Sequence, residues 1–312
     1  MLDAPEKLRP ADLASSSDRS SWDRLEVPGN WTLQGYGRPQ YTNHQPPLPL
    51  EPPQVPRENP TGVYGRKIKV PHAWKNRRTV VHFGGAESAL AVYLDGAFVG
   101  MGKDCRLPSE FDLTPYVTPG KSHWLSAVVI KWSDATWIED QDQWWMAGLH
   151  REVFLYSTEI VHIQDVFAVG SLENDYRDGA LDLTVRVGFP GDAEPGWQVE
   201  AQLHAPSGKP VWRKPEAIPV FAGWREDPGR REARLQKKVR RPRVWSAEEP
   251  NRYQLVMTLV DPEGRTVEAT SVRFGFRSVE VRDRELLING APVMIHGVNR
   301  HDHHDVKGKA LD

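Results

Sequence analysis

Short runs of alternating apolar and polar residues recur along this 312-residue sequence between Pro and Gly clusters, and helical spacing is almost absent. A period of two places every second side chain on the same face of a strand, which is typical of sheets buried on one face. The clearest apolar sets are Leu181, Leu183, Val185, Val187 and Phe189, then Tyr253, Leu255, Met257 and Leu259. The sequence therefore predicts an all-β fold built from sandwiches.

Turn and loop signals divide these strands. "LDGAF" at 94–98 predicts a hairpin turn, and "DPEG" at 261–264 places Pro and Gly where a tight turn requires them. Residues 44–60 are rich in proline, so we expect an extended surface segment that forms no regular sheet hydrogen bonds. The prolines and paired arginines between 205 and 250 indicate a long loop flanked by strand ends.

Composition narrows the class of protein. With 39% hydrophobic residues, a chain of this length buries a sizeable core and suggests about two domains. Forty basic and 42 acidic residues give a net charge of -2, which argues against nucleic acid or an anionic membrane as a partner. Cys105 is the single cysteine, and neither a leader nor an apolar run of about 18 residues is present, so we expect a cytoplasmic protein.

Two changes of pattern suggest domain boundaries. A new set of alternating strands begins with "IVHIQDVFAV", which places one boundary near 157–160. A second follows "VRFGFRS", because "ELLINGAPVMIHGVN" holds a short hairpin and then an apolar run of the kind found in a strand covered on both faces. Residues 1–22 are polar and poorly patterned, so we expect a poorly ordered N-terminal segment.

The segment "HGVNRHDHHDVKGKALD" at 296–312 crowds four histidines among aspartates. Adjacent side chains on an extended strand point apart, so "HDHH" disfavours a structural zinc site, whose ligands are normally spaced along the chain. On a strand His301 and His303 would share one face, and Asp302 and His304 the other. A solvated histidine cluster is the alternative. Patterns for a P-loop, a dinucleotide fold, a nucleophile elbow or an EF-hand are absent.

A second dense constellation lies in "KWSDATWIEDQDQWWMAGLHREV", residues 131–153. It holds three carboxylates and three indoles: Glu139, Asp140, Asp142, Trp137, Trp144 and Trp145. Carboxylates bind sugar hydroxyls, and indole faces pack on the C–H face of a sugar ring. The alternative is a surface loop tied to Arg151, and most of the 12 tryptophans are expected to fill the core.

Eight segments, in this order, resemble bacterial β-galactosidases of the lacZ type in glycoside hydrolase family 2. They are "VPGNW", "YTN", "ENPTGVY", "RLPSEFDLTPY", "EDQDQWWMAGLHREV", "WSAEEPNRY", "FGFR" and "LLINGAPVMIHGVNRHDHH". The resemblance runs from about residue 25 onward. It implies a jelly-roll sugar-binding domain over 23–158, an immunoglobulin-like β-sandwich over 159–277, and the start of a catalytic TIM (β/α)8 barrel over 278–312.

The same resemblance implies site residues. Asn43, Asp142 and His301 match positions that contact the galactosyl group, and Asp142 also matches a ligand of a site-bound sodium ion. The family's magnesium ligands lie outside the matched segments, and Asp302 and Asp305 stand where Glu and Pro are expected. His303 and His304 receive no role. The loop at 219–233 matches weakly a loop that reaches a neighbouring subunit's active site, and the full-length family implies a homo-oligomer.

"PVMIHGVNRH" at 292–301 is similar to the first barrel strand, and active sites of such barrels lie at the C-terminal ends of strands, where "NRHDHH" falls. A lone barrel strand lacks its parallel neighbours. We therefore expect residues 278–312 to present unpaired edges and exposed apolar side chains at Val293, Met294, Ile295 and Val298.

The implied activity is retaining hydrolysis of terminal β-D-galactosides. Such hydrolysis uses two carboxylates about 5 Å apart, an acid/base and a nucleophile. In this family both glutamates come from later barrel strands, so we expect the 312 residues alone to be inactive. The alternative is a non-catalytic carbohydrate-binding or accessory module, and an Asn-Glu pair in downstream sequence would decide against it. β-Glucuronidases and β-mannosidases share the architecture, but "EDQDQWW" and "NRHDHH" favour the galactosidase branch.

Overall fold

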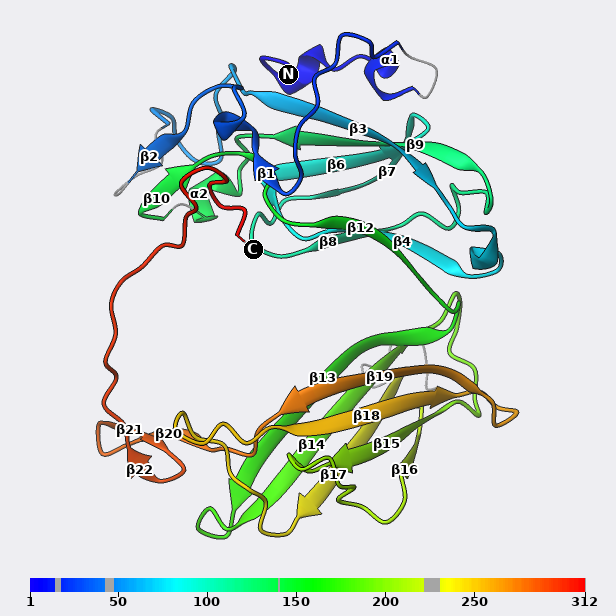
Figure 1. Cartoon of the computed structure of the whole chain (residues 1–312), viewed down its shortest axis with the longest axis vertical. Coiled ribbons are helices and arrows are strands. Elements are labelled where there is room, and N and C mark those ends of the chain that lie inside the picture. The colour runs from blue at the N-terminus through cyan, green and yellow to red at the C-terminus, as the bar shows by residue number, and fades with distance from the viewer. Residues whose placement is uncertain (15–17, 43–47, 140, 222–230, 312) are drawn as a thin grey trace. The chain divides into compact units, whose positions relative to one another are not determined.

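The computed structural model describes residues 1–14, 18–42, 48–139, 141–221 and 231–311 (Figure 1). The chain divides into two compact units. Unit 1 comprises Met1–Ser157 and Asn299–Asp312, and unit 2 comprises Thr158–Val298. Within the described residues no helix is long and apolar enough to cross a membrane.

Unit 1 is a β-sandwich of antiparallel strands. Its four-stranded sheet has the order β3-β9-β6-β7, with bounds Thr61–Lys69, Ser122–Ile130, Ala89–Leu94 and Ala97–Gly102. A three-stranded sheet has the order β12-β4-β8, with bounds Val153–Thr158, Arg78–Phe83 and Ser109–Asp112. Two small sheets complete the unit: β1-β11-β5 (Gly29–Asn30, Gly148–Leu149, Ala86–Glu87) and β10-β2 (Gln143–Trp145, Gln40–Thr42). Its helical turns are short: η1 Pro5–Lys7, α1 Pro10–Leu13, η2 Trp31–Leu33, η3 His72–Trp74 and α2 Thr136–Glu139.

The core of unit 1 lies between its two larger sheets. β6 and β9 contribute Leu90, Val92 and Val129, and β4 contributes Val81 and Phe83. Each of these side chains is at most 2% exposed. Alternation along each strand sends these residues inward and the polar residues between them outward, as a sandwich requires.

Unit 2 is a second sandwich. One sheet has the order β13-β14-β17, with bounds His162–Glu173, Asp178–Gly188 and Glu232–Val239. The other has the order β16-β15-β18-β19, with bounds Glu216–Pro219, Gln198–His204, Tyr253–Val260 and Thr266–Phe274. A small antiparallel sheet follows in the order β20-β21-β22, with bounds Val279–Arg282, Glu285–Ile288 and Ala291–Pro292.

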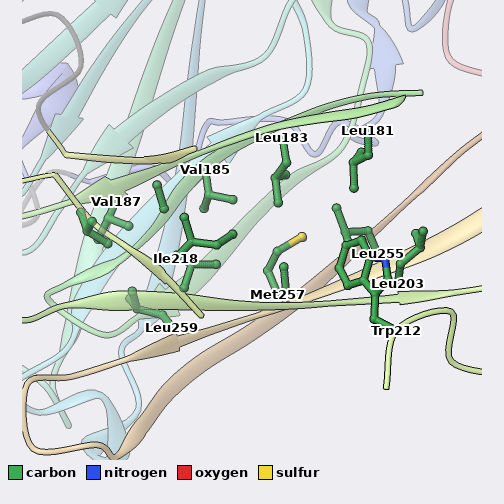
Figure 2. Packing of buried hydrophobic residues seen from close by; sticks show 14 of the residues in the cluster. Leu181, Leu183, Val185, Val187, Leu203, Trp212, Ile218, Leu255, Met257 and Leu259 are labelled. Atoms are coloured by element: carbon green, nitrogen blue, oxygen red, sulfur yellow. The ribbon is translucent and has the colours of Figure 1, made fainter. Parts of the chain in front are cut away.

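The two alternating strands predicted from sequence are confirmed as β14 and β18. Leu183 on β14 and Leu255 on β18 are fully buried, and Figure 2 shows both rows of side chains pointing into one core. Both predicted turns are also present. Asp95 (φ 49°) and Gly96 (φ 87°) join β6 to β7 in the left-handed conformation that two-residue hairpins use, and Gly264 (φ 82°) closes the β18–β19 turn.

The long loop expected between 205 and 250 is wrong in part. β16 pairs with β15, and β17 pairs with β14 over Glu232–Val239. The apolar row of "EARLQKKV" is interrupted by Lys237, which shares a face with Ala233, Leu235 and Val239, and this masked the strand in the sequence. Most of the 219–233 loop lies outside the described residues.

The N-terminal segment differs from the expectation of a poorly ordered lead. Leu2 exchanges backbone hydrogen bonds with Thr61, and Ala4 and Leu13 are buried. The apolar residues of this otherwise polar stretch are sparse, but Leu2 pairs with the first residue of β3 and two others are buried. Hence a segment without periodicity can still pack by a few anchors.

The barrel-like strand expected over 292–301 is not formed. β22 ends at Pro292, and residues 293–300 have no regular structure. Strands of a parallel barrel are held by neighbours on both sides, and none pairs with this segment in the described chain. As expected, Val293, Met294, Ile295 and Val298 are exposed, yet the last residues differ from a free edge: Gly308 and Ala310 are buried in unit 1.

Candidate functional site

Pairing of β2 with β10 joins two of the sequence segments singled out for chemistry. Tyr41 lies opposite Trp144, and Thr42 lies opposite Gln143. The "YTN" and "DQWW" segments, about a hundred residues apart, therefore form one antiparallel ribbon. Asn43 follows β2 directly but lies outside the described residues, so its predicted sugar contact stays a prediction.

Asp142 sits at the start of this ribbon with an aromatic pair beside it. The Tyr41 hydroxyl donates a hydrogen bond to Asp142 Oδ1, and the Tyr41 and Trp144 ring centroids are 5.3 Å apart. Tyr41 is 51% exposed and Trp144 is 43% exposed. The hydrogen bond to Asp142 raises the pKa of the Tyr41 phenol, which keeps the proton in place. An exposed carboxylate beside exposed aromatic faces is suited to a polar ligand with an apolar face.

The other indoles of this region are structural. Trp132 and Trp145 are buried against Leu48 with ring centroids 5.5 Å apart, and Trp137 donates its Nε1–H to the Gln54 carbonyl at 2.9 Å. These indoles pack in the interior and support the buried side of the ribbon.

Of the two remaining carboxylates of this region, one has a structural partner. Glu139 Oε1 accepts the Cys105 amide at 3.0 Å, so it serves the fold, and Asp140 lies outside the described residues. The alternative of a loop tied down by Arg151 is not seen, since Arg151 donates to the Arg106 and Gly84 carbonyls instead.

A pocket of about 190 Å³ lies next to the ribbon. Its lining is mostly charged: Glu87, Cys105, Arg106, His150, Arg151, Asp302, Lys309 and Leu311. Gln143 links ribbon and pocket because, in the hydrogen-bonded orientation of its amide, its side-chain oxygen accepts from Arg106 Nη2 at 2.7 Å. Asp302, which follows His301, lines the pocket, and Gln143, which follows Asp142, contacts Arg106 of its lining.

Glu87 is the most buried charge of the pocket, at 1% exposure. Burial alone would raise its pKa, but the Lys309 charge and hydrogen bond, His150 and the Ala147 amide together hold the Glu87 pKa below its usual value. Burial lowers the pKa of His150 to about 4, so this imidazole is neutral near pH 7.

Arg106 and Arg151 have no carboxylate partner among the described residues; their guanidinium groups donate to backbone carbonyls and, from Arg106, to the Gln143 amide oxygen. Asp302 is paired with Arg300, and Glu87 is paired with Lys309 at 2.8 Å. The two arginines therefore leave the pocket with unneutralised positive charge, which favours ligands rich in oxygen acceptors.

His301 is exposed, and its ring centroid lies 6.4 Å from that of His303. The shared strand face predicted for this pair does not apply, because no strand forms here. His304 has a structural role: its Nδ1 accepts the amides of Val306 and Lys307 at 3.0 and 3.2 Å. The described residues thus bring Asp142 together with Tyr41 and Trp144, and they place His301 in the same unit.

The fit to a metal can be tested on the side chains present. Asp142 offers one exposed carboxylate, and one of its oxygens already accepts from Tyr41. Within the described ranges no group of three or more His, Cys, Asp or Glu side chains is arranged to hold a metal ion. The residues described therefore supply one oxygen toward a sodium site, not a full donor set, and none can be assigned to magnesium.

Sequence reasoning missed Glu87, Lys309 and Asn30, which organise the pocket. A signal for Glu87 was present: it is the one charge within the run "GGAESALAV", and a buried charge needs a partner. Lys309 and Asn30 carried no such signal because their burial depends on long-range contacts. A second pocket, of about 250 Å³ and lined by residues such as Trp22, Trp31 and Tyr64, contains none of the predicted site residues.

The chain matches three family models in succession. Residues 2–159 match the sugar binding domain of glycosyl hydrolases family 2. Residues 161–277 match a second model, described simply as glycosyl hydrolases family 2. Residues 279–312 match the TIM barrel domain of the same family. The last match confirms that the barrel domain begins here in sequence, although no barrel strand forms.

Curated relatives include β-galactosidases from Alteromonas mediterranea, 37% identical over 100% of this chain, and Pectobacterium atrosepticum, 40% identical over 92% of it. The chain spans only 30% and 28% of their lengths. The fold is similar to a Bacteroides uniformis β-glucuronidase (TM-score 0.79, 19% identity, covering 100% of this chain and 35% of the other). It also resembles a Bifidobacterium dentium β-glucuronidase (TM-score 0.71, 22% identity, covering 92% and 48%). With a sugar-binding sandwich, a second sandwich and the opening of a TIM barrel in this order, the chain belongs to glycosyl hydrolases family 2.

Proposed function

We propose that this chain is the sugar-binding portion of a β-galactosidase that hydrolyses terminal β-D-galactosides with retention. The observation that carries the proposal is the 37% identity to a β-galactosidase over the whole chain. The exposed carboxylate and aromatic pair of unit 1 supports it, because together they offer acceptors to hydroxyls and a flat face to a sugar ring. Asp142, His301 and Asn43 are the proposed galactosyl contacts.

We further propose that the 312 residues do not hydrolyse galactosides by themselves. The chain spans about a third or less of the relatives' lengths, and retaining chemistry needs two carboxylates about 5 Å apart. One acidic pair, Glu110 and Glu152, flanks His82 at 2.8 and 3.7 Å, but both side chains are exposed and line neither pocket.

The test is incubation with a chromogenic β-galactoside, using the wild-type chain with Glu110→Gln and Asp302→Asn variants. We expect no turnover above the buffer rate. Turnover that is abolished by a change at one of the chain's own carboxylates would contradict the proposal.

A second test concerns Asp142, which we propose supplies one oxygen to a sodium ion beside the galactosyl group. Asp142→Ala should weaken galactose binding and remove its sodium dependence together, because one carboxylate serves both. Asp175→Ala, at an exposed turn in unit 2, is the matched control and should change neither. Weaker binding with an intact sodium response would show that Asp142 does not hold the ion.

A non-catalytic carbohydrate-binding module is the second candidate, favoured by the match of residues 2–159 to a sugar binding domain. Both candidates predict galactoside binding. They differ in sequence, because only the enzyme requires an Asn-Glu pair at a barrel strand end of the same reading frame.

A further inference from the structure

We propose that residues 304–310 are a docking segment that binds the sandwich of unit 1, and that Lys309 is the positioning residue for the adjoining loop 301–303. The assignment of that loop to galactoside contact rests on the proposed function; the docking itself does not. Four features of the segment carry the inference: a closed turn, a buried ion pair, a glycine that fits only one surface, and a charged loop held next to the pocket.

The segment forms its own turn before it meets the sandwich. His304 and Gly308 exchange two backbone hydrogen bonds, with N–H to O distances of 2.8 and 2.9 Å. His304 Nδ1 accepts the Val306 and Lys307 amides inside the turn. A turn closed by four hydrogen bonds presents Lys309 in a fixed direction, which lowers the entropy lost on docking.

The Lys309 side chain lies in a site that stabilises a cation. Its Nζ lies 2.8 Å from Glu87 Oε1 and 5.7 Å from the centre of the Trp145 ring. Glu87 Oε2 is already occupied by the amides of Ala147 (2.8 Å) and Met146 (3.2 Å), so the carboxylate is fixed in orientation. The Lys309 side chain is only 14% exposed. A buried carboxylate without this cation would be strongly unfavourable, so the pair couples the tail to the sandwich.

Backbone and shape complete the contact. The Lys309 amide donates to Asn30 Oδ1 at 2.8 Å, and Asn30 Nδ2 donates to the Ala147 carbonyl at 3.0 Å. Gly308 has φ +67°, and a Cβ there would lie 2.6 Å from Met146 Sδ and 2.8 Å from Leu33 Cδ1. A side chain here would be strained at this backbone angle and would displace its neighbours, so Gly308 is fitted to this surface.

Docking holds the charged loop 301–303 next to the pocket. Asp302 lines the same pocket as Arg106 and Arg151, and only five residues separate it from Gly308. So short a connection restricts how far the loop can move once Lys309 is bound. Without this anchor, nothing described in unit 1 holds residues 299–303 by backbone pairing.

The experiment is hydrogen exchange followed by mass spectrometry on the 312-residue chain, reading the peptide that covers 304–311. In the wild type we expect exchange at least about tenfold slower than in Lys309→Met, where the peptide should exchange as an undocked segment. Gly308→Ala should give the same loss with both charges intact. Lys103→Met is the matched control, because it removes the exposed Lys103–Asp134 pair of the same unit and should leave the peptide unchanged.

Folding is checked in the same data from peptides of β6 and β9. If Lys309→Met loosens these strands as well, the double variant Glu87→Gln/Lys309→Met removes the unpaired buried charge and should restore them while the tail stays released. The inference is overturned if the wild-type peptide exchanges at the undocked rate, or if Lys309→Met and Gly308→Ala both leave it within twofold of wild type. Adding methyl β-galactoside distinguishes failure of the docking from failure of the proposed function. A docked tail in a chain that binds no sugar contradicts the proposed function but not the docking.

Discussion

The two sandwiches bury different chemistry. Of the sixteen buried polar or charged side chains among the described residues, thirteen lie in unit 1, and only His162, Glu232 and Asp261 lie in unit 2. In unit 2, Glu232 and Asp261 are paired with exposed arginines at the rim of the sheets. In unit 1, Glu87 and His150 are buried in the lining of the pocket, and the buried Lys131 interacts with the Glu87 charge.

The difference in buried residues indicates a different role for each sandwich. The rows on β14 and β18 of unit 2 alternate regularly, and the core of aliphatic and aromatic side chains that they form contributes packing energy. Unit 1 buries charged groups, and the desolvation of a charge is unfavourable unless the charge is paired. These buried groups line a polar pocket. Perturbed groups that cluster at one pocket are the usual mark of a functional site.

The largest effect should come from unit 2. Leu255 is fully buried on β18, so Leu255→Ala should lower the free energy of unfolding of this unit by about 2–5 kcal/mol through lost burial and a residual cavity. Urea unfolding with hydrogen exchange of peptides from each unit measures it. Gln254→Ala, on the opposite face of the same strand, is the control. A loss under 1 kcal/mol would show that the core is not packed by alternation as described.

Unit 1 should instead respond to mild acid. The folded pKa of His150, about 4, lies below its ordinary value of 6.5, so the unfolded chain binds more protons between these pH values. The contribution is complete above pH 6.5 and is lost as pH falls toward 4, by up to about 3 kcal/mol. His150→Gln should flatten this dependence, whereas His72→Gln, at an exposed residue, should retain it. A wild-type unit 1 whose stability is level from pH 6.5 to 5 contradicts the buried neutral imidazole.

The third prediction is a gain of stability in unit 1. Burial lowers the pKa of Lys131 to about 8, and its ammonium group donates to the Arg38 carbonyl at 3.2 Å. Lys131→Met should stabilise unit 1 by about 1–3 kcal/mol at pH 7, because an apolar side chain of similar length carries no desolvation cost. In the wild type, stability should rise from pH 8 to 10.5, where the unfolded chain binds the extra proton. A destabilised Met variant would show that the charge is better solvated than its burial indicates.

The smallest effect should be equal in both units. Gly96 in unit 1 and Gly264 in unit 2 occupy turns at φ +87° and +82°, and neither is crowded. Gly96→Ala and Gly264→Ala should each cost about 1 kcal/mol, set by the backbone angle alone. Thermal unfolding of both variants measures this. A difference of more than about 1 kcal/mol between them would mean that the surroundings of these turns matter.

Much of unit 2 could be predicted from sequence because a period of two reports burial directly. The rows from Leu181 to Val187 and from Tyr253 to Leu259 are strands of one core, as the pattern indicated. β17 was missed because Lys237 stands in its apolar row, between Leu235 and Val239. The alternation signal weakens where a long charged side chain occupies a position on the covered face.

Unit 1 was less predictable in the part that matters for function. The segments holding Tyr41 and Asp142 could be identified separately, and the resemblance assigned Asp142 a role, but their pairing is a long-range event. The anchoring of Lys309 on Glu87 joins residues 222 positions apart, and no local pattern encodes it. The barrel strand was expected from an apolar run and from the resemblance, whereas a parallel strand needs neighbours to exist.

The central claim, that the galactoside site lies in the polar sandwich and not in the apolar one, is tested most directly by a two-dimensional NMR titration. Methyl β-galactoside is added to isotopically labelled chain, and the amide and indole N–H signals are followed by residue. The account predicts shifts at Tyr41, Asp142 and Trp144 that a Trp144→Ala variant loses, with the signals of β14 and β18 unmoved. Saturable shifts confined to unit 2, or none in unit 1 at millimolar galactoside, would contradict it.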